Sequence, residues 1–339
     1  MTAPSRSWIL SWESTLVVLI VAAGAWSTTL SSYYLSFEQI AYSSRHFVIP
    51  GLLALGLMVV VVVGEIDISL ASTLAVGSVL MSKFSAGQVS IWIAAPVVAL
   101  SCAILGALNG ALVARLHLPS LAVTLGTMGA FRGLAFIIGT EVGYTDFDDS
   151  YLHVGSDQVI GGVVPISLIL FLVAALAVGC LMHGTVFGRR CYAVGNNAEA
   201  AWISGIDVRA LKTCVYALAG GLAGLAALVW IGQYGSARGD NADGMILLVV
   251  TAVVLGGVDI NGGRGAVLGV VLSLFLLGTL RNGMGLANVP GPTQTVVFGA
   301  LLILGVLRPI VLGTIARWRQ TPVLAATGTK GGESVNSTT

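Results

Sequence analysis

Two carboxylates, Glu65 and Asp67, lie between two apolar segments and could handle protons or cations. Ionisable groups at membrane depth are costly, so they either cap a helix at an interface or line a pathway. Spaced by two residues, they would not share a helix face. We therefore expect a short break in the helix, with Asp67 and Ser69 capping the next segment at the membrane interface. A proton or cation relay through Glu65 and Asp67 is the alternative.

The other chemistry-bearing residues form no recognisable catalytic or metal-binding set. The four histidines and four cysteines have no metal-ligand spacing, so the sequence predicts no metal site, no cofactor and no disulfide framework. Phosphate-binding, zinc-protease and nucleophile-elbow motifs are missing, and we predict no catalytic residue. Any energy from ATP must therefore come from another chain. Arg132 is a lone cation inside an apolar segment, which we expect to be paired or to face a cavity.

The composition is that of a membrane protein. Hydrophobic residues make up 56% of the 339 residues and charged residues 9%, whereas soluble domains carry about 25% charged residues. The formal net charge of +1 favours no nucleic-acid partner. A bilayer core requires about 20 apolar residues in a helix. About ten segments qualify: 15–32, 47–64, 67–83, 91–113, 120–139, 165–183, 213–232, 246–258, 265–282 and 294–313. They predict an all-α, polytopic transmembrane bundle, with 246–258 short enough to be a half-helix.

The distribution of Lys and Arg predicts that both ends of the chain are cytoplasmic. With that orientation, eleven of these residues are inside and four outside, and Arg132 lies within a span. The longest outside loop, 140–164, contains five acidic residues and no Lys or Arg. We divide the chain into a cytoplasmic N-terminus (1–14), a permease domain (15–313) and a disordered cytoplasmic tail (314–339).

Glycines spaced by four residues indicate close helix packing within the bundle. The pairs are Gly106 with Gly110, Gly129 with Gly133, Gly220 with Gly224, and Gly265 with Gly269. A long-range repeat is also visible, since residues 63–68 (VGEIDI) resemble residues 255–260 (LGGVDI) at an offset of 192. Transporters are often built from two related halves. Ten spans make this repeat parallel, and a half-helix at 246–258 would make it inverted.

The polar inside loop 184–212 predicts one short helix of about two turns. Asn197 is a good N-cap, Glu199 suits the positive end of the helix, and Gly205 can end it. Isolated helices this short do not persist in water, so this one needs a partner surface. An interfacial linker helix and a docking helix are both compatible with the pattern.

Three strings together resemble the permeases of monosaccharide-type ABC importers, the ribose, xylose, rhamnose and autoinducer-2 group. They are GEIDISL at 64–70, the loop 188–206 with its GR, AVGN and SGI elements, and AVVLGGVDINGGRG at 252–265. The first string departs from the family by carrying Glu65 where glycine is usual. The segment 234–240 (YGSARGD) is most similar to the rhamnose and autoinducer-2 branch.

The resemblance implies a bundle of the type II ABC importer kind in the bacterial inner membrane, acting as a permease for a monosaccharide or related small polar solute. Two cytoplasmic ATP-binding subunits, a second permease subunit and a periplasmic binding protein would be its partners. In the ATPase-coupling loop, the residues implied are Gly188, Arg189, Asn197, Glu199, Ala200, Ser204 and Gly205. In the other two strings they are Gly64, Asp67, Ser69, Gly256, Gly257, Gly262 and Gly263.

Two other functions remain compatible with the sequence. An ion-coupled secondary transporter would use Glu65 and Asp67, but it predicts more charged groups inside the spans than Arg132 alone. An integral membrane enzyme would need a nucleophile or metal constellation, which the sequence lacks.

Overall fold

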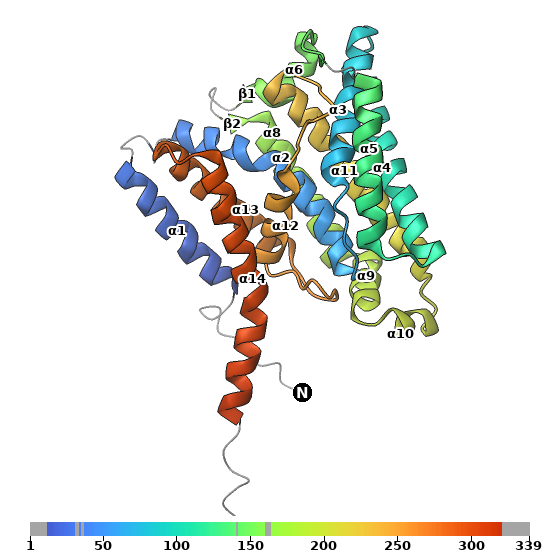
Figure 1. Ribbon diagram of the computed structural model, residues 1–339, viewed down its shortest axis with the longest axis vertical. Helices are drawn as coiled ribbons and strands as arrows, with labels where there is room; N and C mark the ends of the chain where they lie inside the picture. Colours follow the sequence, from blue (N-terminus) through green and yellow to red (C-terminus); the bar gives the residue numbers. More distant parts are fainter. Residues whose placement is uncertain (1–11, 31–33, 35–36, 140–141, 160–163, 321–339) are drawn as a thin grey trace, which may run out of the picture.

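The computed structural model describes residues 12–30, 34, 37–139, 142–159 and 164–320, and these residues are almost entirely helical (Figure 1). The elements are α1 Trp12–Leu30, α2 Phe37–Val62, α3 Leu70–Ala86, α4 Ile91–Leu116, α5 Ser120–Gly139, α6 Asp149–Ser156, β1 Gln158–Val159, β2 Val164–Pro165, α8 Ile166–Gly184, α9 Val186–Asn196, α10 Ala198–Ile203, α11 Val208–Tyr234, α12 Met245–Leu255, α13 Val267–Leu286 and α14 Gly291–Gln320. The predicted all-α transmembrane fold is confirmed.

Each of the ten predicted apolar segments falls on a helix. Within the described residues, seven helices are long and apolar enough to cross a membrane, and α3, α12 and Gly291–Leu307 of α14 are shorter apolar helices. Of the predicted tail, residues 314–320 continue α14 as helix, while 321–339 lie outside the described residues. The expected N-terminal segment 1–14 likewise lies outside them, except for 12–14, which open α1.

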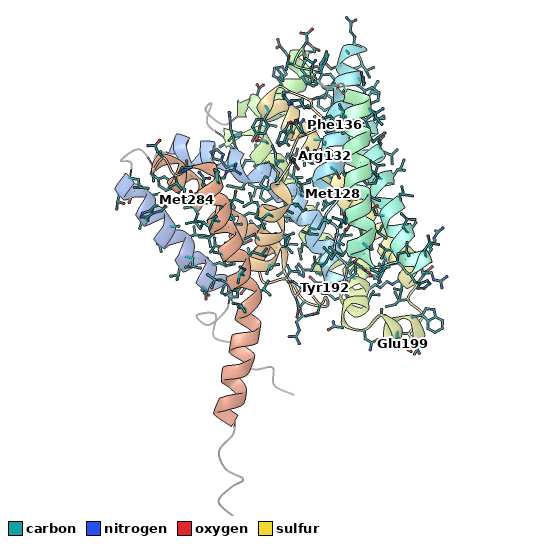
Figure 2. All side chains as sticks on the ribbon, viewed as in Figure 1. Met128, Arg132, Phe136, Tyr192, Glu199 and Met284 are labelled. Atoms are coloured by element: carbon teal, nitrogen blue, oxygen red, sulfur yellow. The ribbon has the colours of Figure 1, made fainter. Side chains whose placement is uncertain are left out.

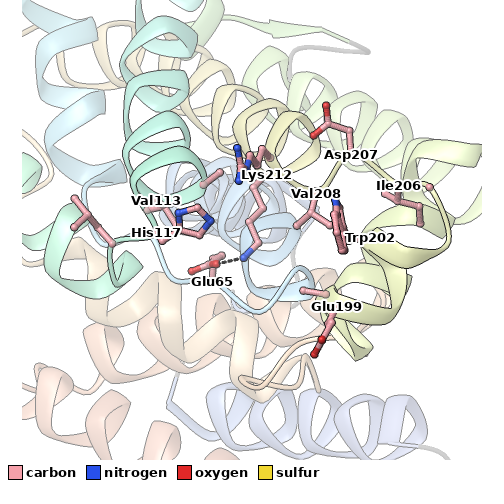
Figure 3. A pocket seen from close by; sticks show the side chains of 14 residues that line it. Glu65, Val113, His117, Glu199, Trp202, Ile206, Asp207, Val208 and Lys212 are labelled. Carbon is pink, nitrogen blue, oxygen red and sulfur yellow. Dashed lines mark hydrogen bonds and ion pairs between the residues drawn. The ribbon is translucent and has the colours of Figure 1, made fainter.

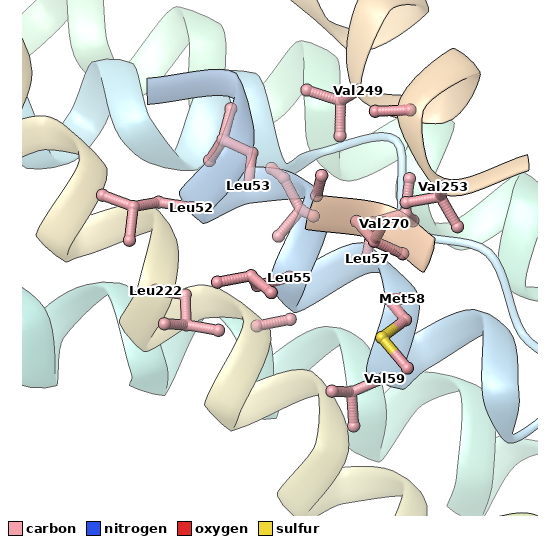
Figure 4. Close-up of a cluster of buried hydrophobic side chains, with 14 of the residues drawn as sticks. Leu52, Leu53, Leu55, Leu57, Met58, Val59, Leu222, Val249, Val253 and Val270 are labelled. Atoms are coloured by element: carbon pink, nitrogen blue, oxygen red, sulfur yellow. The ribbon is translucent and has the colours of Figure 1, made fainter. Parts of the chain in front are cut away.

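Helix α2 is the centre of the bundle. In its apolar stretch Ser43–Val62, 89% of the residues are buried, whereas in the apolar stretch of α1 only 17% are buried. A helix that is apolar all round is stable only when neighbours surround it. Figure 4 shows how: side chains of α2 pack against Leu222 of α11, Val249 and Val253 of α12, and Val270 of α13.

Glycines allow α4 and α11 to approach closely. A methyl group at Gly106 would clash with the carbonyl of Tyr216, and one at Gly220 would clash with the carbonyl of Cys102. The predicted close packing is confirmed at Gly106, Gly110, Gly220 and Gly224. It is wrong for the pair Gly265 and Gly269, because Gly265 precedes α13 and only Gly269 packs in a helix. A Cβ added at Gly129 or Gly133 would have no neighbouring atom within 4 Å among the described residues, so their packing stays a prediction.

The bundle has two distinct ends. At one end α6 packs on the α3–α4 connection, where the Tyr151 hydroxyl donates to the carbonyl of Val89 at 2.6 Å. Figure 1 shows α6, β1 and β2 at this end and α9 and α10 at the opposite one. We call the latter the α9–α10 end. The turn after α2 and the connection after α12 both lie there, because the Gly263 amide donates to the carbonyl of Val62 at 2.9 Å.

The sequence repeat corresponds to a structural one. In both copies a helix is followed by a turn with a left-handed glycine and then by another helix, although Gly64 (φ 80°) and Gly257 (φ 84°) are one position out of register with the offset of 192, which pairs Gly64 with Gly256. In both, an aspartate accepts a hydrogen bond from the amide two residues later, Asp67 from Ser69 and Asp259 from Asn261. Helices α2 and α12 end at the same end of the bundle, so the repeat is parallel although α12 is short.

Candidate coupling site at the α9–α10 end

Helix α10 forms where the local sequence signals predicted it. The Asn197 side chain accepts a hydrogen bond from the Ala200 amide at 2.9 Å, which satisfies one of the free amides of the first turn. At the other end Gly205 has φ 85°, and its amide donates to the carbonyl of Trp202 at 2.9 Å. A left-handed glycine in this position is a common way to end a helix.

The prediction of a single short helix in this loop is wrong, because α9 precedes α10. Thr185 caps α9, and Gly188, Cys191 and Val194 are buried on one side of it. Two glycines made the segment resemble a non-helical loop. In the fold these glycines allow the backbone of α9 to approach two neighbouring backbone segments. A methyl group at Gly188 would clash with the Met182 carbonyl, and one at Gly195 would clash with the Val62 carbonyl.

The three strings that carry the family resemblance meet at one point. A Cβ added at Gly262 would lie 2.8 Å from the Gly64 amide nitrogen and 3.0 Å from the Gly195 carbonyl oxygen. Gly262 and Gly263 both have positive φ (90° and 75°), which other residues rarely adopt. The backbone of all three segments is therefore packed too closely for side chains.

Side chains of α9 strengthen this junction. The Tyr192 hydroxyl donates to the carbonyl of Gly265 at 2.8 Å, and the Asn196 amide group donates to that of Gly263 at 3.4 Å. Gly256 packs against the backbone of Val270. Helix α9 is thereby fixed to the connection between α12 and α13. A displacement of α9 would be transmitted directly to the helices that surround α2.

Helix α10, in contrast, is attached on one side only. Ala201 is its buried residue, while Trp202 and Ile203 are 68% and 74% exposed. The predicted coupling residues Arg189, Glu199, Ala200 and Ser204 are exposed as well, whereas Gly188 is buried. Figure 2 shows Tyr192 and Glu199 together at this end of the molecule. Large exposed apolar side chains among polar ones are typical of a protein-binding surface.

A cavity of about 1020 Å³ separates α10 from the ends of α4 and α11. Figure 3 shows His117, Trp202 and Val208 around it, with Glu65 and Lys212 in contact. The Lys212 ammonium group and the Glu65 carboxylate form an ion pair, and their side chains are only 17% and 13% exposed. The pair joins the first turns of α11 to the turn after α2, which sequence reasoning did not foresee.

Asp67 is completely buried within the protein, in the turn between α2 and α3. The position of this turn at the membrane interface stays a prediction. Its Oδ1 accepts hydrogen bonds from the Ser69 amide at 2.9 Å and the Ser69 hydroxyl at 2.6 Å. Ser69 occupies the N-cap position of α3, but its side chain makes no capping bond, which corrects its predicted capping role. The hydroxyl is used by Asp67 and Asn109 instead.

Arg132 has partners in the backbone of the segment that precedes α12. Its guanidinium group donates to the carbonyls of Gly239 at 2.8 Å and Asn241 at 2.7 Å, and it lies 3.8 Å from the Asp243 carboxylate. Figure 2 shows it part-way along α5, between Met128 and Phe136. The segment before α12 therefore reaches into the bundle. This explains why α12 needs only 11 residues, about 16 Å of helix.

The elements of the site are a rigid glycine junction, an exposed short helix and an ion pair that connects two helix ends. Nothing in its geometry among the described residues aligns a nucleophile with a base.

Comparisons with known proteins agree on one family. Residues 39–306 match the family described as branched-chain amino acid transport system / permease component. The autoinducer 2 import system permease protein LsrD of Enterobacter sp. (strain 638) is 31% identical over 304 residues, covering 88% of this chain and 92% of the relative. LsrD of Yersinia enterocolitica is 32% identical over 302 residues (87% and 91%), and that of Photorhabdus luminescens is 32% identical over 320 residues (91% and 96%). No solved structure matches significantly.

Proposed function

This chain belongs to the branched-chain amino acid transport system / permease component family, and from that premise we propose that it imports autoinducer 2 or a related sugar-like solute as the permease subunit of an ABC importer. The relatives are permease proteins of import systems. Among its described residues, this chain has seven helices that are long and apolar enough to cross a membrane. The solute assignment rests on the function named for the LsrD relatives and on the 234–240 segment. Rhamnose, the other solute favoured by that segment, is the alternative within the same class.

The observation that carries the coupling role is the surface of α10. Trp202 and Ile203 are more than two-thirds exposed on a helix of six residues. Such a helix is not stable alone, and exposed aromatic and aliphatic anchors are enriched at the centres of protein interfaces. We assign this surface to a cytoplasmic ATP-binding subunit, which would supply the force that this chain cannot generate.

The proposed orientation places the α9–α10 end, and both chain termini, in the cytoplasm of a bacterium with an inner membrane. The excess of Lys and Arg in the segments at that end supports this assignment. The opposite end, with α6 and its acidic neighbours, would face the periplasm and receive solute from a binding protein. The functional division into 1–14, 15–313 and 314–339 remains a proposal.

A second permease subunit is expected to cover α5. Leu125 and Ile137 on this helix are 54% and 82% exposed, and Gly126, Gly129 and Gly133 have open space around them. Small residues on a transmembrane helix permit close approach of another helix. The pathway would then lie between two copies, or between this chain and a similar one.

Reconstitution in proteoliposomes tests the function. The chain is combined with candidate ATP-binding subunits and binding proteins, and uptake is measured for autoinducer 2, rhamnose and a pentose. We expect uptake that requires ATP, the ATP-binding subunits and the binding protein. Solute movement by the purified chain alone, driven by an ion gradient, would instead support the secondary transporter.

A further inference from the structure

A cluster of buried polar side chains links the turn after α2 to α4 and α5. Asp67, Ser69, Asn109 and Thr124 are all completely buried. The Asn109 amide nitrogen donates to the Ser69 hydroxyl at 2.9 Å, and the Ser69 hydroxyl donates to Asp67 Oδ1 at 2.6 Å. Thr124 of α5 donates to the carbonyl of Ile66 at 3.3 Å. The cluster is sealed from solvent on every side.

Two oxygen atoms of this cluster lack partners. Asp67 Oδ2 and Asn109 Oδ1 are buried and accept no hydrogen bond. The side chains that carry them are joined through Ser69. An ionised carboxylate and an amide carbonyl are both acceptors only, so neither can satisfy the other. A proton on Asp67 Oδ2 would turn that atom into a donor. A hydrogen bond from it to Asn109 Oδ1 would then satisfy both atoms.

The charge around Asp67 leads to the same conclusion. In the part of the chain that the structure describes, no Lys, Arg or His forms an ion pair with Asp67. The cation of this region, Lys212 of α11, is paired with Glu65 of the same turn. Tyr216 of α11 faces the turn too, but its hydroxyl donates to the carbonyl of Ile66 at 3.3 Å. From α4 and α5 the neighbours are neutral. A buried carboxylate without a cation is expected to be neutral.

We propose that Asp67 is a proton-binding site, and that its protonated carboxyl group donates a hydrogen bond to Asn109 Oδ1 and so fastens the turn after α2 to α4. The proton is held within the cluster and is not carried across the membrane with the solute. Burial raises the pKa of the Asp67 carboxyl group to about 6, against the opposing effect of hydrogen bonding by Ser69 and by the Asn109 side chain. The fastening is therefore complete below this pKa and is released as the pH rises through about 6.

The chain contains a natural control in the second copy of the repeat. Asp259 makes the same turn, accepting from the Asn261 amide at 3.0 Å, but it is partly exposed and near the surface of the junction. Its carboxylate is accessible to water. The two aspartates differ in burial while sharing local geometry.

Infrared difference spectroscopy of the purified protein tests the proposal through the carbonyl stretch of a protonated carboxylic acid. We expect this band to appear between mildly alkaline and mildly acidic pH, to be lost in Asp67→Asn and to be unchanged in Asp259→Asn. Persistence of the band at full intensity in Asp67→Asn, or titration with the midpoint of an exposed aspartate, would overturn the proposal.

A second variant tests the acceptor and does not depend on the first one folding. In Asn109→Leu the carboxyl group keeps its proton but loses the acceptor for it. We expect the band to shift to the higher frequency of an unbonded carboxyl group. An unchanged frequency in this variant would refute the contact with Asn109.

Discussion

Lys212 in α11 and Glu65 in the turn after α2 form an ion pair although 147 positions separate them in the sequence. Both side chains are largely shielded from solvent, so screening weakens the pair little. Glu65 stands at the position where the family resemblance implies a glycine. The pair therefore gives this chain a connection between the α11 start, next to α10, and the helix at the centre of the bundle.

Removing Lys212 should cost stability without abolishing transport. Lys212→Met leaves the Glu65 carboxylate largely buried and unpaired, and we expect a loss of about 2 kcal/mol in unfolding free energy. Lys212→Met combined with Glu65→Gln should recover much of that loss. Chemical or thermal unfolding in detergent measures both. ATP-driven uptake should persist in Glu65→Gly as well, and its disappearance would favour a relay role for Glu65.

Trp202 should be required for coupling and dispensable for folding. Its side chain is 68% exposed, so Trp202→Ala removes few contacts within this chain. We expect the variant to insert and unfold normally but to lose most of the uptake and of the solute-stimulated ATPase activity. Trp92, 87% exposed in the first turn of α4, is the matched control. Equal losses in Trp92→Ala and Trp202→Ala would exclude a specific docking role.

Gly205 should be sensitive to substitution because of its backbone conformation. At φ 85° a side chain costs about 1 kcal/mol, although a Cβ would meet open space. Proline cannot adopt this φ and removes the amide that bonds to Trp202. We expect Gly205→Ala to weaken uptake and Gly205→Pro to block it, with membrane insertion unaffected. Gly184→Ala, also in open space, should be neutral, and normal uptake by Gly205→Pro would contradict the docking assignment.

Arg132 should hold the segment before α12 in place. In Arg132→Met two carbonyls lose charged donors, and we expect a loss of about 2 kcal/mol in unfolding free energy together with most of the uptake. Arg132→Lys should recover only part of the lost stability and uptake, because an ammonium group cannot reproduce the geometry of the planar guanidinium group. Arg238 lies in the same segment but is 52% exposed, so Arg238→Met is the control. Similar unfolding curves for both methionine variants would refute this role.

What the sequence predicted well was local or periodic. The apolar segments are long enough to be predicted as membrane helices from composition alone. Helix α10 was predicted from the residues at its two ends, Asn197 and Gly205. Spacing alone predicted that Gly106 with Gly110, and Gly220 with Gly224, lie on closely packed helix faces, but the pairing of α4 with α11 is seen only in the structure. Gly129 and Gly133 have the same spacing but no covering element among the described residues, because spacing fixes a helix face and not the element that covers it.

What the sequence could not predict depends on contacts between distant segments. Helix α9 contains Gly188 and Gly195, which lower its helix propensity, and only the backbone they pack against explains them. The meeting of Gly64, Gly195 and Gly262 joins three strings that sequence reasoning had treated separately. Arg132 donates hydrogen bonds to backbone carbonyls. Every residue has such a carbonyl, so the sequence gives no sign of which residues accept these bonds. The burial of Asp67 is likewise a property of the bundle.

The stability of this protein should depend on pH through Asp67. Because the folded-state pKa is raised from 3.8 to about 6, the folded protein binds the proton more tightly than the unfolded chain. The resulting stabilisation is present below pH 3.8 and is lost as the pH rises through about 6. At 1.36 kcal/mol per pKa unit it amounts to about 3 kcal/mol. Asparagine mimics the protonated carboxyl group, so the wild type and Asp67→Asn should differ little in thermal unfolding at mildly acidic pH, and the wild type should become the less stable of the two as the pH rises through about 6. A constant difference between the two over that range would show that Asp67 does not titrate there.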